Sequence, residues 1–130
     1  MKRQAILIFS HELTGEQKKE LKDKWGVNRI VPMPEDILET WGNVPPEIPS
    51  LKGFVRPVLE WLVKVAFPDD VVLVQGDFGA TFIVVNFSLK LGLVPVYSTT
   101  KRDVTEEAYP GGEVRQNRIF KHQMFRRYEE

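Results

Sequence analysis

The sequence predicts an α/β fold with an open, mostly parallel sheet that ends in a β-hairpin. Short apolar runs alternate with amphipathic segments over the first hundred residues, which is typical of strands joined by helices. After residue 102 the pattern changes, and two extended segments flank Pro110-Gly111-Gly112, which predicts the hairpin. At this length, we expect residues 1–130 to form a single domain.

Four apolar runs are expected to form the parallel part of the sheet, at 4–9, 28–33, 71–75 and 93–97. A proline, Pro32, favours an edge position for the second run, because proline cannot donate to a strand ladder. Right-handed crossovers then predict the strand order 2-1-3-4, with the hairpin on the far edge.

Helices are predicted between these strands. Thr14 and Gln17 form a capping box at the start of the first helix, and Gly26 fits its C-terminal cap. In the third helix, Pro57 either lies in the first turn or kinks the helix. The last helix is apolar on most faces, so it is either buried on most sides or packed against a second subunit, and we expect a homodimer. The second, third and last helices are expected at 34–41, 51–66 and 79–91.

Composition excludes several classes of function. The 18 basic and 18 acidic residues balance, which argues against binding to long nucleic acids. The chain has no cysteine, so disulfides, thiolate catalysis and cysteine metal sites are excluded. No signal peptide or apolar stretch of about 20 residues is visible, so we expect a cytoplasmic protein without a membrane partner.

Three polar clusters follow predicted strands, and parallel strands would bring all three to one edge of the sheet. They are Ser10-His11, the turn 75–81 and the segment 98–102. Ligands of open α/β sheets bind at the carboxyl edge, where the connections of neighbouring strands leave in opposite directions. A helix N-terminus at this edge also favours an anion. The sequence therefore predicts an anion site there.

The turn after the third strand offers the most candidates. Gly76 and Gly79 are expected to allow positive φ and close approach of a ligand. Asp77 either caps the helix or accepts hydrogen bonds from a ribose or base, Phe78 can stack on a base, and Thr81 can reach a phosphate. The same residues also fit a plain strand-to-helix turn that binds nothing. The candidate ligand-binding residues of this turn are Gln75, Gly76, Asp77, Phe78, Gly79 and Thr81.

The two other clusters supply the candidate catalytic groups. Ser10 can hold a phosphate oxygen and His11 can transfer a proton, although either can instead cap the turn. In the last cluster, hydroxyls and cations suit a phosphodiester, or else form a solvated loop. The candidates there are Thr99, Thr100, Lys101 and Arg102. His122 in the hairpin is not expected to complete a metal site, and neither the dinucleotide fingerprint nor a Walker lysine is present, so we expect no metal and no cofactor.

Several stretches together resemble a small CRISPR-associated family of type III systems, related to the Rossmann-like (CARF) domains that sense cyclic oligoadenylates. The resemblance covers almost the whole chain and rests on 6–11, 73–81, 94–102 and 120–122. It implies a Rossmann-like, CARF-like domain that forms a homodimer with a ring-shaped adenylate, expected to be the four-membered ring, across its two-fold axis. It also implies a metal-independent ring nuclease, in which a ribose 2′-hydroxyl attacks the neighbouring phosphorus and leaves a 2′,3′-cyclic phosphate, which switches the antiviral signal off.

The resemblance also suggests roles for individual residues. Ser10 and the Lys101-Arg102 pair would contact the scissile phosphate, and the turn 76–81 would cradle the ligand. The chain departs from the two-domain sensors in lacking a fused effector domain, which favours a stand-alone degrader or sponge. Two alternatives therefore stay open: a sponge or regulatory subunit that holds the ring without cutting it, and a nucleotide-binding protein unrelated to defence.

Overall fold

A computed structural model describes residues 3–130, apart from the side chains of 103–105, 107 and 117–119. It contains a five-stranded mixed sheet in the order β2-β1-β3-β4-β5, which confirms the predicted order 2-1-3-4 with the hairpin on the edge. The pairs among β2, β1, β3 and β4 are parallel, and β4 and β5 are antiparallel. The strands are β1 (Arg3–Ile8), β2 (Val27–Val31), β3 (Val71–Val74), β4 (Val94–Ala108) and β5 (Val114–Arg127).

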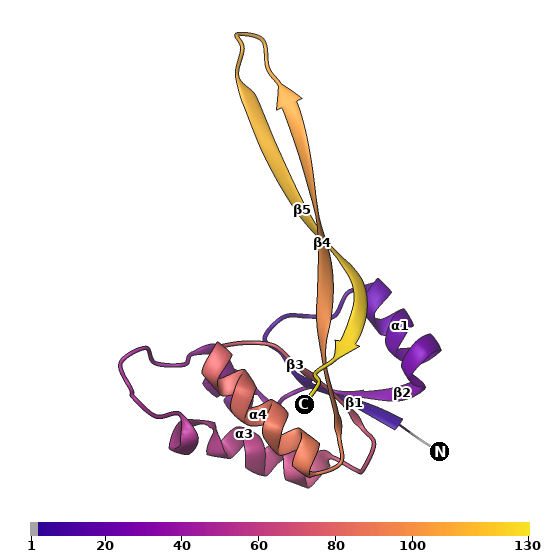
Figure 1. Cartoon of the computed structure of the whole chain (residues 1–130), viewed down its shortest axis with the longest axis vertical. Coiled ribbons are helices and arrows are strands. Elements are labelled where there is room, and N and C mark those ends of the chain that lie inside the picture. Colours follow the sequence, from indigo (N-terminus) through magenta and orange to yellow (C-terminus); the bar gives the residue numbers. More distant parts are fainter. Residues whose placement is uncertain (1–2) are drawn as a thin grey trace.

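Helices cover both faces of this sheet. Alternate residues of β3 face opposite sides, so Val72 and Val74 pack with α2, α3 and α4, whereas Leu73 packs with α1. All four residues of β3 are fully buried, which explains their unbroken apolar run. The helices are α1 (Gly15–Trp25), α2 (Glu35–Gly42), α3 (Lys52–Val65) and α4 (Phe78–Lys90) (Figure 1). No helix in the described part of the chain is long and apolar enough to cross a membrane.

The sequence signals that predicted the two ends of α1 are confirmed. Thr14 and Gln17 form the expected capping box, and Gly26 takes a left-handed φ of 66° after α1. Pro57 lies inside α3 and not in its first turn.

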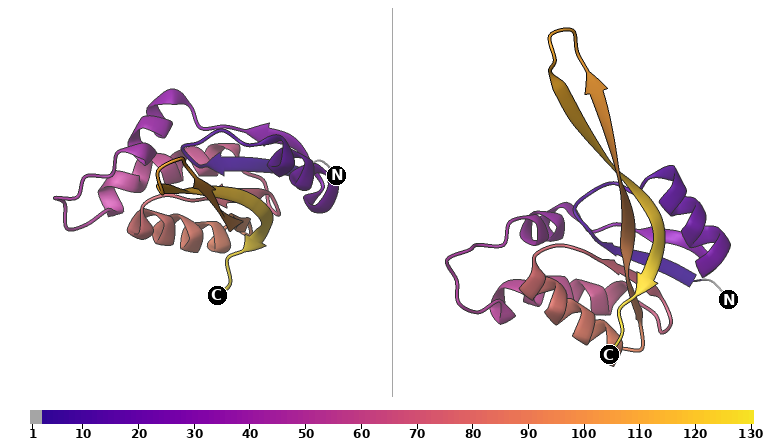
Figure 2. Two further views of the ribbon diagram at one scale, coloured as in Figure 1. Left: turned by 90° about the horizontal axis from the view of Figure 1, so that it is seen from above. Right: turned by 45° about the horizontal axis from the view of Figure 1, so that its top comes forward.

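The fourth strand is longer than predicted. We expected it to end at Tyr97 and to be followed by a polar loop, but β4 continues through Ala108 and pairs with β5 along that whole length. Beyond the sheet the two strands form an arm, residues 101–121, that projects from the body (Figures 1 and 2). The turn at its tip is where the sequence placed it, and Gly111 and Gly112 have positive φ there.

Candidate functional site

The carboxyl ends of β1 and β3 lie at one edge of the sheet, where β4 passes from its parallel pairing with β3 toward the arm. The parallel register pairs Ile8 with Val74, and Leu73 with Val96. Gln75 joins these ends, because its backbone N–H donates to the carbonyl of Ile8 (3.1 Å) and its side-chain Oε1 accepts from the N–H of Ser98 (2.8 Å). Ser10-His11, the turn 75–81 and Ser98 therefore lie at one edge.

The glycine turn is built differently from our expectation. Neither Gly76 nor Gly79 has a positive φ, so that prediction was wrong. Gly76 instead leaves room for Trp41: a Cβ there would lie 2.8 Å from three atoms of the indole ring. The indole Nε1 of Trp41 also donates to the carbonyl of Gln75 (3.0 Å). Packing against Trp41 thus explains Gly76 without any ligand.

The start of α4 is a capped helix N-terminus. Asp77 is the N-cap, and its Oδ2 accepts from the N–H of Ala80 (3.0 Å), so the capping alternative is confirmed. The side chain of Phe78 is 95% exposed. Thr81 Oγ1 is buried and has no hydrogen-bond partner among the described residues. Within that same part of the chain, the N–H groups of Phe78 and Gly79 make no hydrogen bond, and they remain available to an anion.

Ser10 and His11 lie in an exposed turn after β1. The His11 ring packs edge-on against Phe9, with 5.3 Å between the ring centroids. Both residues line a hollow of about 390 Å³ that also includes Lys18 from α1 and Met33 after β2. Among the described residues, no group hydrogen-bonds to the His11 imidazole, so the contact with Phe9 is the interaction that the structure gives this ring.

The cluster 99–102 lies in β4, at and just before the base of the arm, so the expectation of a solvated loop was wrong. Its two threonines and two cations form a strand because each of them pairs with a residue of β5. Neighbouring strand residues point to opposite faces, so Lys101 and Arg102 do not act as one cationic pair. Lys101 stands directly opposite Lys121, whereas the guanidinium of Arg102 lies over the ring of Phe120, 5.4 Å from its centroid. Thr100 pairs with His122, and Thr99 Oγ1 donates to the carbonyl of Met124 (3.0 Å).

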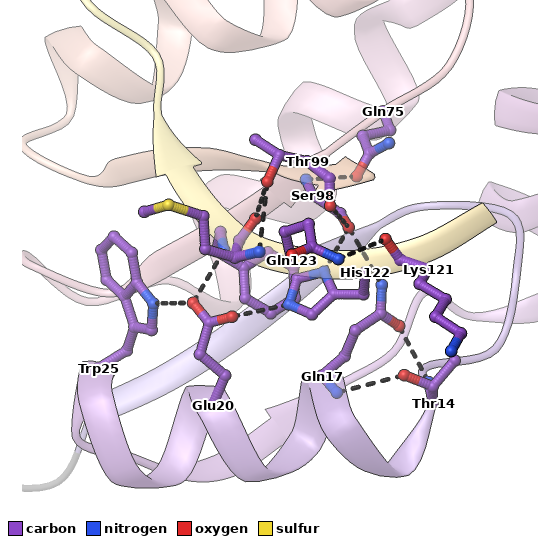
Figure 3. Close-up of polar contacts among 12 residues, drawn as sticks. Thr14, Gln17, Glu20, Trp25, Gln75, Ser98, Thr99, Lys121, His122 and Gln123 are labelled. Carbon is purple, nitrogen blue, oxygen red and sulfur yellow. Dashed lines mark hydrogen bonds and ion pairs between the residues drawn. The ribbon is translucent and has the colours of Figure 1, made fainter. Parts of the chain in front are cut away.

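Three side chains at this edge, Ser98, His122 and Glu20, form a continuous hydrogen-bonded group that the sequence did not predict (Figure 3). Ser98 Oγ lies 2.5 Å from His122 Nδ1, and His122 Nε2 lies 2.6 Å from Glu20 Oε1. These residues come from β4, β5 and α1. The side chains of His122 and Glu20 are 6% and 9% exposed, so the contact between them is buried, whereas Ser98 is partly exposed.

A β-bulge places His122 in this group. Thr99 pairs with Met124 and Thr100 pairs with His122, so Gln123 is an extra residue on β5. If the ladder continued regularly, Gln123 would pair with Thr100 and His122 with Lys101, so His122 would point to the opposite face from Ser98. The imidazole also packs on Phe125, with 4.6 Å between ring centroids.

Glu20 anchors the group to α1. Its Oε2 accepts hydrogen bonds from Trp25 Nε1 (2.9 Å) and from the N–H of Phe125 (2.8 Å), while Oε1 faces His122. Burial raises the pKa of this carboxyl, but the hydrogen bonds from Phe125, Trp25 and His122, and the charge of the imidazole, outweigh it, and the pKa lies below its ordinary value. Glu20 is therefore ionised at neutral pH. The one signal for it in the sequence is its position three residues after Gln17, on the same face of α1.

The fold and site define a class: a mixed α/β protein whose mostly parallel sheet carries polar clusters and a hairpin arm at its carboxyl edge. The model of the family described as "Uncharacterized protein MJ1673 family" matches residues 3–126, and the chain belongs to this family. A relative of that name from Methanocaldococcus jannaschii is 41% identical over 123 residues, which cover 95% of each chain. No solved structure matches the chain.

Proposed function

We propose that this protein is a cytoplasmic, Rossmann-like ring nuclease that binds cyclic oligoadenylate at the carboxyl edge of its sheet and linearises it without a metal ion. The sequence resemblance described above supports the ligand. The observation that carries the proposal is that two features lie beyond the same edge of the parallel sheet: the start of α4, where two N–H groups make no hydrogen bond in the described chain, and the base of the arm, where Lys101 stands opposite Lys121. Both features favour a phosphodiester.

The arm supplies a specific argument for an anion. Lys101 and Lys121 face each other directly on one side of the arm, and neither has an ion-pair partner among the described residues. Like charges directly opposite in an antiparallel pair destabilise the pairing. A phosphate between the two ammonium groups would relieve that repulsion and stabilise charge that develops on its oxygens during cleavage. This pair replaces Lys101-Arg102 as the proposed cationic contact.

The proposed assembly is a homodimer with the ring across its two-fold axis. On α4, Phe78 and Phe82 are 95% and 70% exposed, and with Val85 and Leu89 they line a hollow of about 650 Å³. These residues recur at helical spacing on one side of α4, so they form an apolar stripe that a second copy can cover. The stripe begins at the proposed ligand turn, which would place two ligand sites next to each other.

The second candidate is a binding protein that holds the ring without cutting it. It is favoured by the exposed turn after β1, where the His11 imidazole contacts the ring of Phe9 but has no hydrogen-bond partner in the described chain that would prepare it for proton transfer. Binding alone needs only the cations and N–H groups, and these are present in either case.

Incubation with labelled cyclic tri-, tetra- and hexa-adenylate, with and without EDTA, tests both candidates. The enzyme proposal expects linear products ending in a 2′,3′-cyclic phosphate, at a rate that EDTA does not change. Binding without cleavage would favour the second candidate. If the protein shows no binding and no cleavage, both candidates are overturned.

Lys101→Ala then tests the role of the arm. We expect it to lower the single-turnover rate by about 100-fold, and to weaken binding less, because the lost cation stabilises developing charge. Ser10→Ala should do the same to a smaller extent. The matched control is Lys52→Ala, which removes an exposed lysine at the start of α3 and should change neither quantity.

A further inference from the structure

The hydrogen bonds around Ser98 run in one direction, which can be deduced from the groups at the ends of the network. At one end, Gln17 Oε1 accepts from the N–H of Thr14 (2.9 Å) in the capping box, so its Nε2 is the atom that faces Ser98 Oγ (3.4 Å). At the other end, the ionised Glu20 can only accept. The proton between Glu20 and His122 therefore lies on Nε2 of the imidazole.

This arrangement leaves Nδ1 of a neutral His122 with a lone pair, aimed at Ser98 Oγ from 2.5 Å. With the imidazole neutral, the serine hydroxyl donates to Nδ1 at the shorter distance, and the carbonyl of Thr99, 3.4 Å away, is its other acceptor. A hydroxyl, an imidazole and a buried carboxylate joined in this order form the arrangement that activates serine nucleophiles, and it is recognised by geometry and roles and not by sequence position. Either imidazole nitrogen can serve as the base, since each carries the lone pair in one tautomer.

The burial pattern also suits a reactive hydroxyl. The base and its carboxylate are buried, with His122 and Glu20 at 6% and 9% exposure, while Ser98 is partly open to solvent. Low local polarity strengthens the interaction between an imidazolium and Glu20. The packing of Phe125 on the imidazole keeps that ring in one orientation.

Two carboxamides flank the hydroxyl. Gln75 Oε1 is occupied by the N–H of Ser98, which fixes the orientation of the amide and leaves its Nε2 without a partner among the described residues. Gln17 Nε2 already approaches Ser98 Oγ. The Gln17 amide thus donates to the serine oxygen itself, while the Gln75 amide holds the backbone N–H of Ser98.

We propose that Ser98 is a nucleophile for ester substrates, with His122 as its general base and Glu20 as the positioning residue. Ser98 Oγ forms a bond to the electrophilic carbon or phosphorus, its proton moves to His122 Nδ1, and the leaving group departs with the electron pair of the bond that breaks. The leaving oxygen then takes the proton from His122. The inference concerns a protein nucleophile and does not rest on the proposed 2′-hydroxyl attack within cyclic oligoadenylate.

A fluorophosphonate probe tests this proposal directly, because it contains no nucleotide and reports only on a reactive hydroxyl. Attack by Ser98 Oγ on its phosphorus expels fluoride and leaves a stable phosphonyl ester. We expect peptide mass mapping of the treated full chain to find one adduct, on Ser98, and Ser98→Ala to lose it. Ser50→Ala, which removes an exposed serine before α3, is the matched control and should keep the adduct.

The base is tested by His122→Gln, which keeps a hydrogen-bonding side chain but no proton acceptor of comparable basicity. Labelling of Ser98 should slow by about 100-fold or more. An unlabelled Ser98 in the wild-type protein, or labelling no faster than that of Ser50, would overturn the proposal, and this result needs no variant to fold. The labelling result does not depend on whether cyclic oligoadenylate is cleaved, so the serine nucleophile and the ring nuclease can each be refuted without the other.

Discussion

Replacing Gly76 with alanine should destabilise the fold, because the turn after β3 has no room for a Cβ. The added carbon would lie 2.8 Å from Cε2, Cζ2 and Nε1 of Trp41, whereas carbon atoms in contact are about 3.5–4.0 Å apart. The indole is 3% exposed and donates to the carbonyl of Gln75. It cannot move away without losing packing and this hydrogen bond.

The expected cost follows from these two losses. Overpacking costs about 1–3 kcal/mol, and a lost hydrogen bond about 1 kcal/mol more, so the free energy of unfolding should fall by about 2–4 kcal/mol. For a domain of this size that corresponds to a drop in Tm of roughly 8–16 °C. Gly53→Ala is the matched control: Gly53 lies in α3 with nothing within 4 Å of the added Cβ, and alanine there should stabilise by about 0.5–1 kcal/mol.

Thermal unfolding of the two variants, followed by circular dichroism, measures the difference. If Gly76→Ala unfolds at the temperature of Gly53→Ala, then Trp41 does not pack against the turn as described. That result would also favour the original interpretation, in which Gly76 allows a ligand to approach the backbone.

Three further predictions concern the buried carboxylate of Glu20, the proposed dimer and the turn at the start of α4. Glu20→Gln should lower the free energy of unfolding at pH 7 by about 2–3 kcal/mol, because three donors lose a charged acceptor. Since folding lowers the pKa of Glu20 below 4.5, the wild type holds this stability above that pH and loses it as the pH falls further, so urea unfolding of the variant should depend less on pH in the acid range. Phe82→Glu should convert a dimer to a monomer in sedimentation equilibrium, and a wild-type monomer at micromolar concentration would contradict the proposed assembly. Gly79→Val should weaken ring binding, because the exposed start of α4 gains bulk. The added Cβ lies 3.2 Å from Leu51 Cδ1, so the end of that side chain must shift for the fold to survive, and an unchanged Kd in the folded variant would make this turn purely structural.

Local sequence patterns were sufficient for most of the sheet and the helix ends. The capping box at Thr14 and the glycine at Gly26 act within one helix turn, so their residues identify them without tertiary information. The length of β4 could not be predicted in this way. Residues 98–102 are polar and resemble a loop, and only their pairing with β5, far along the chain, makes them a strand.

The Ser98 group escaped prediction for a related reason. Its members are far apart in the sequence and meet only through the packing of α1 on β5 and the register of the hairpin. The bulge at Gln123 decides which face His122 occupies, and a one-residue change in register reverses that choice. No local pattern marks the bulge, so the sequence gives His122 a place in the family resemblance and no metal, but no role in this group.

Hydrogen exchange of the full chain, with and without a saturating cyclic tetra-adenylate, tests most directly whether the carboxyl edge is the ligand site. The account predicts slower exchange at the N–H groups of Phe78 and Gly79, which make no hydrogen bond in the described part of the chain, together with protection at the base of the arm around Lys101. Protection confined to another surface, or no change under conditions where the ring is bound, would contradict it.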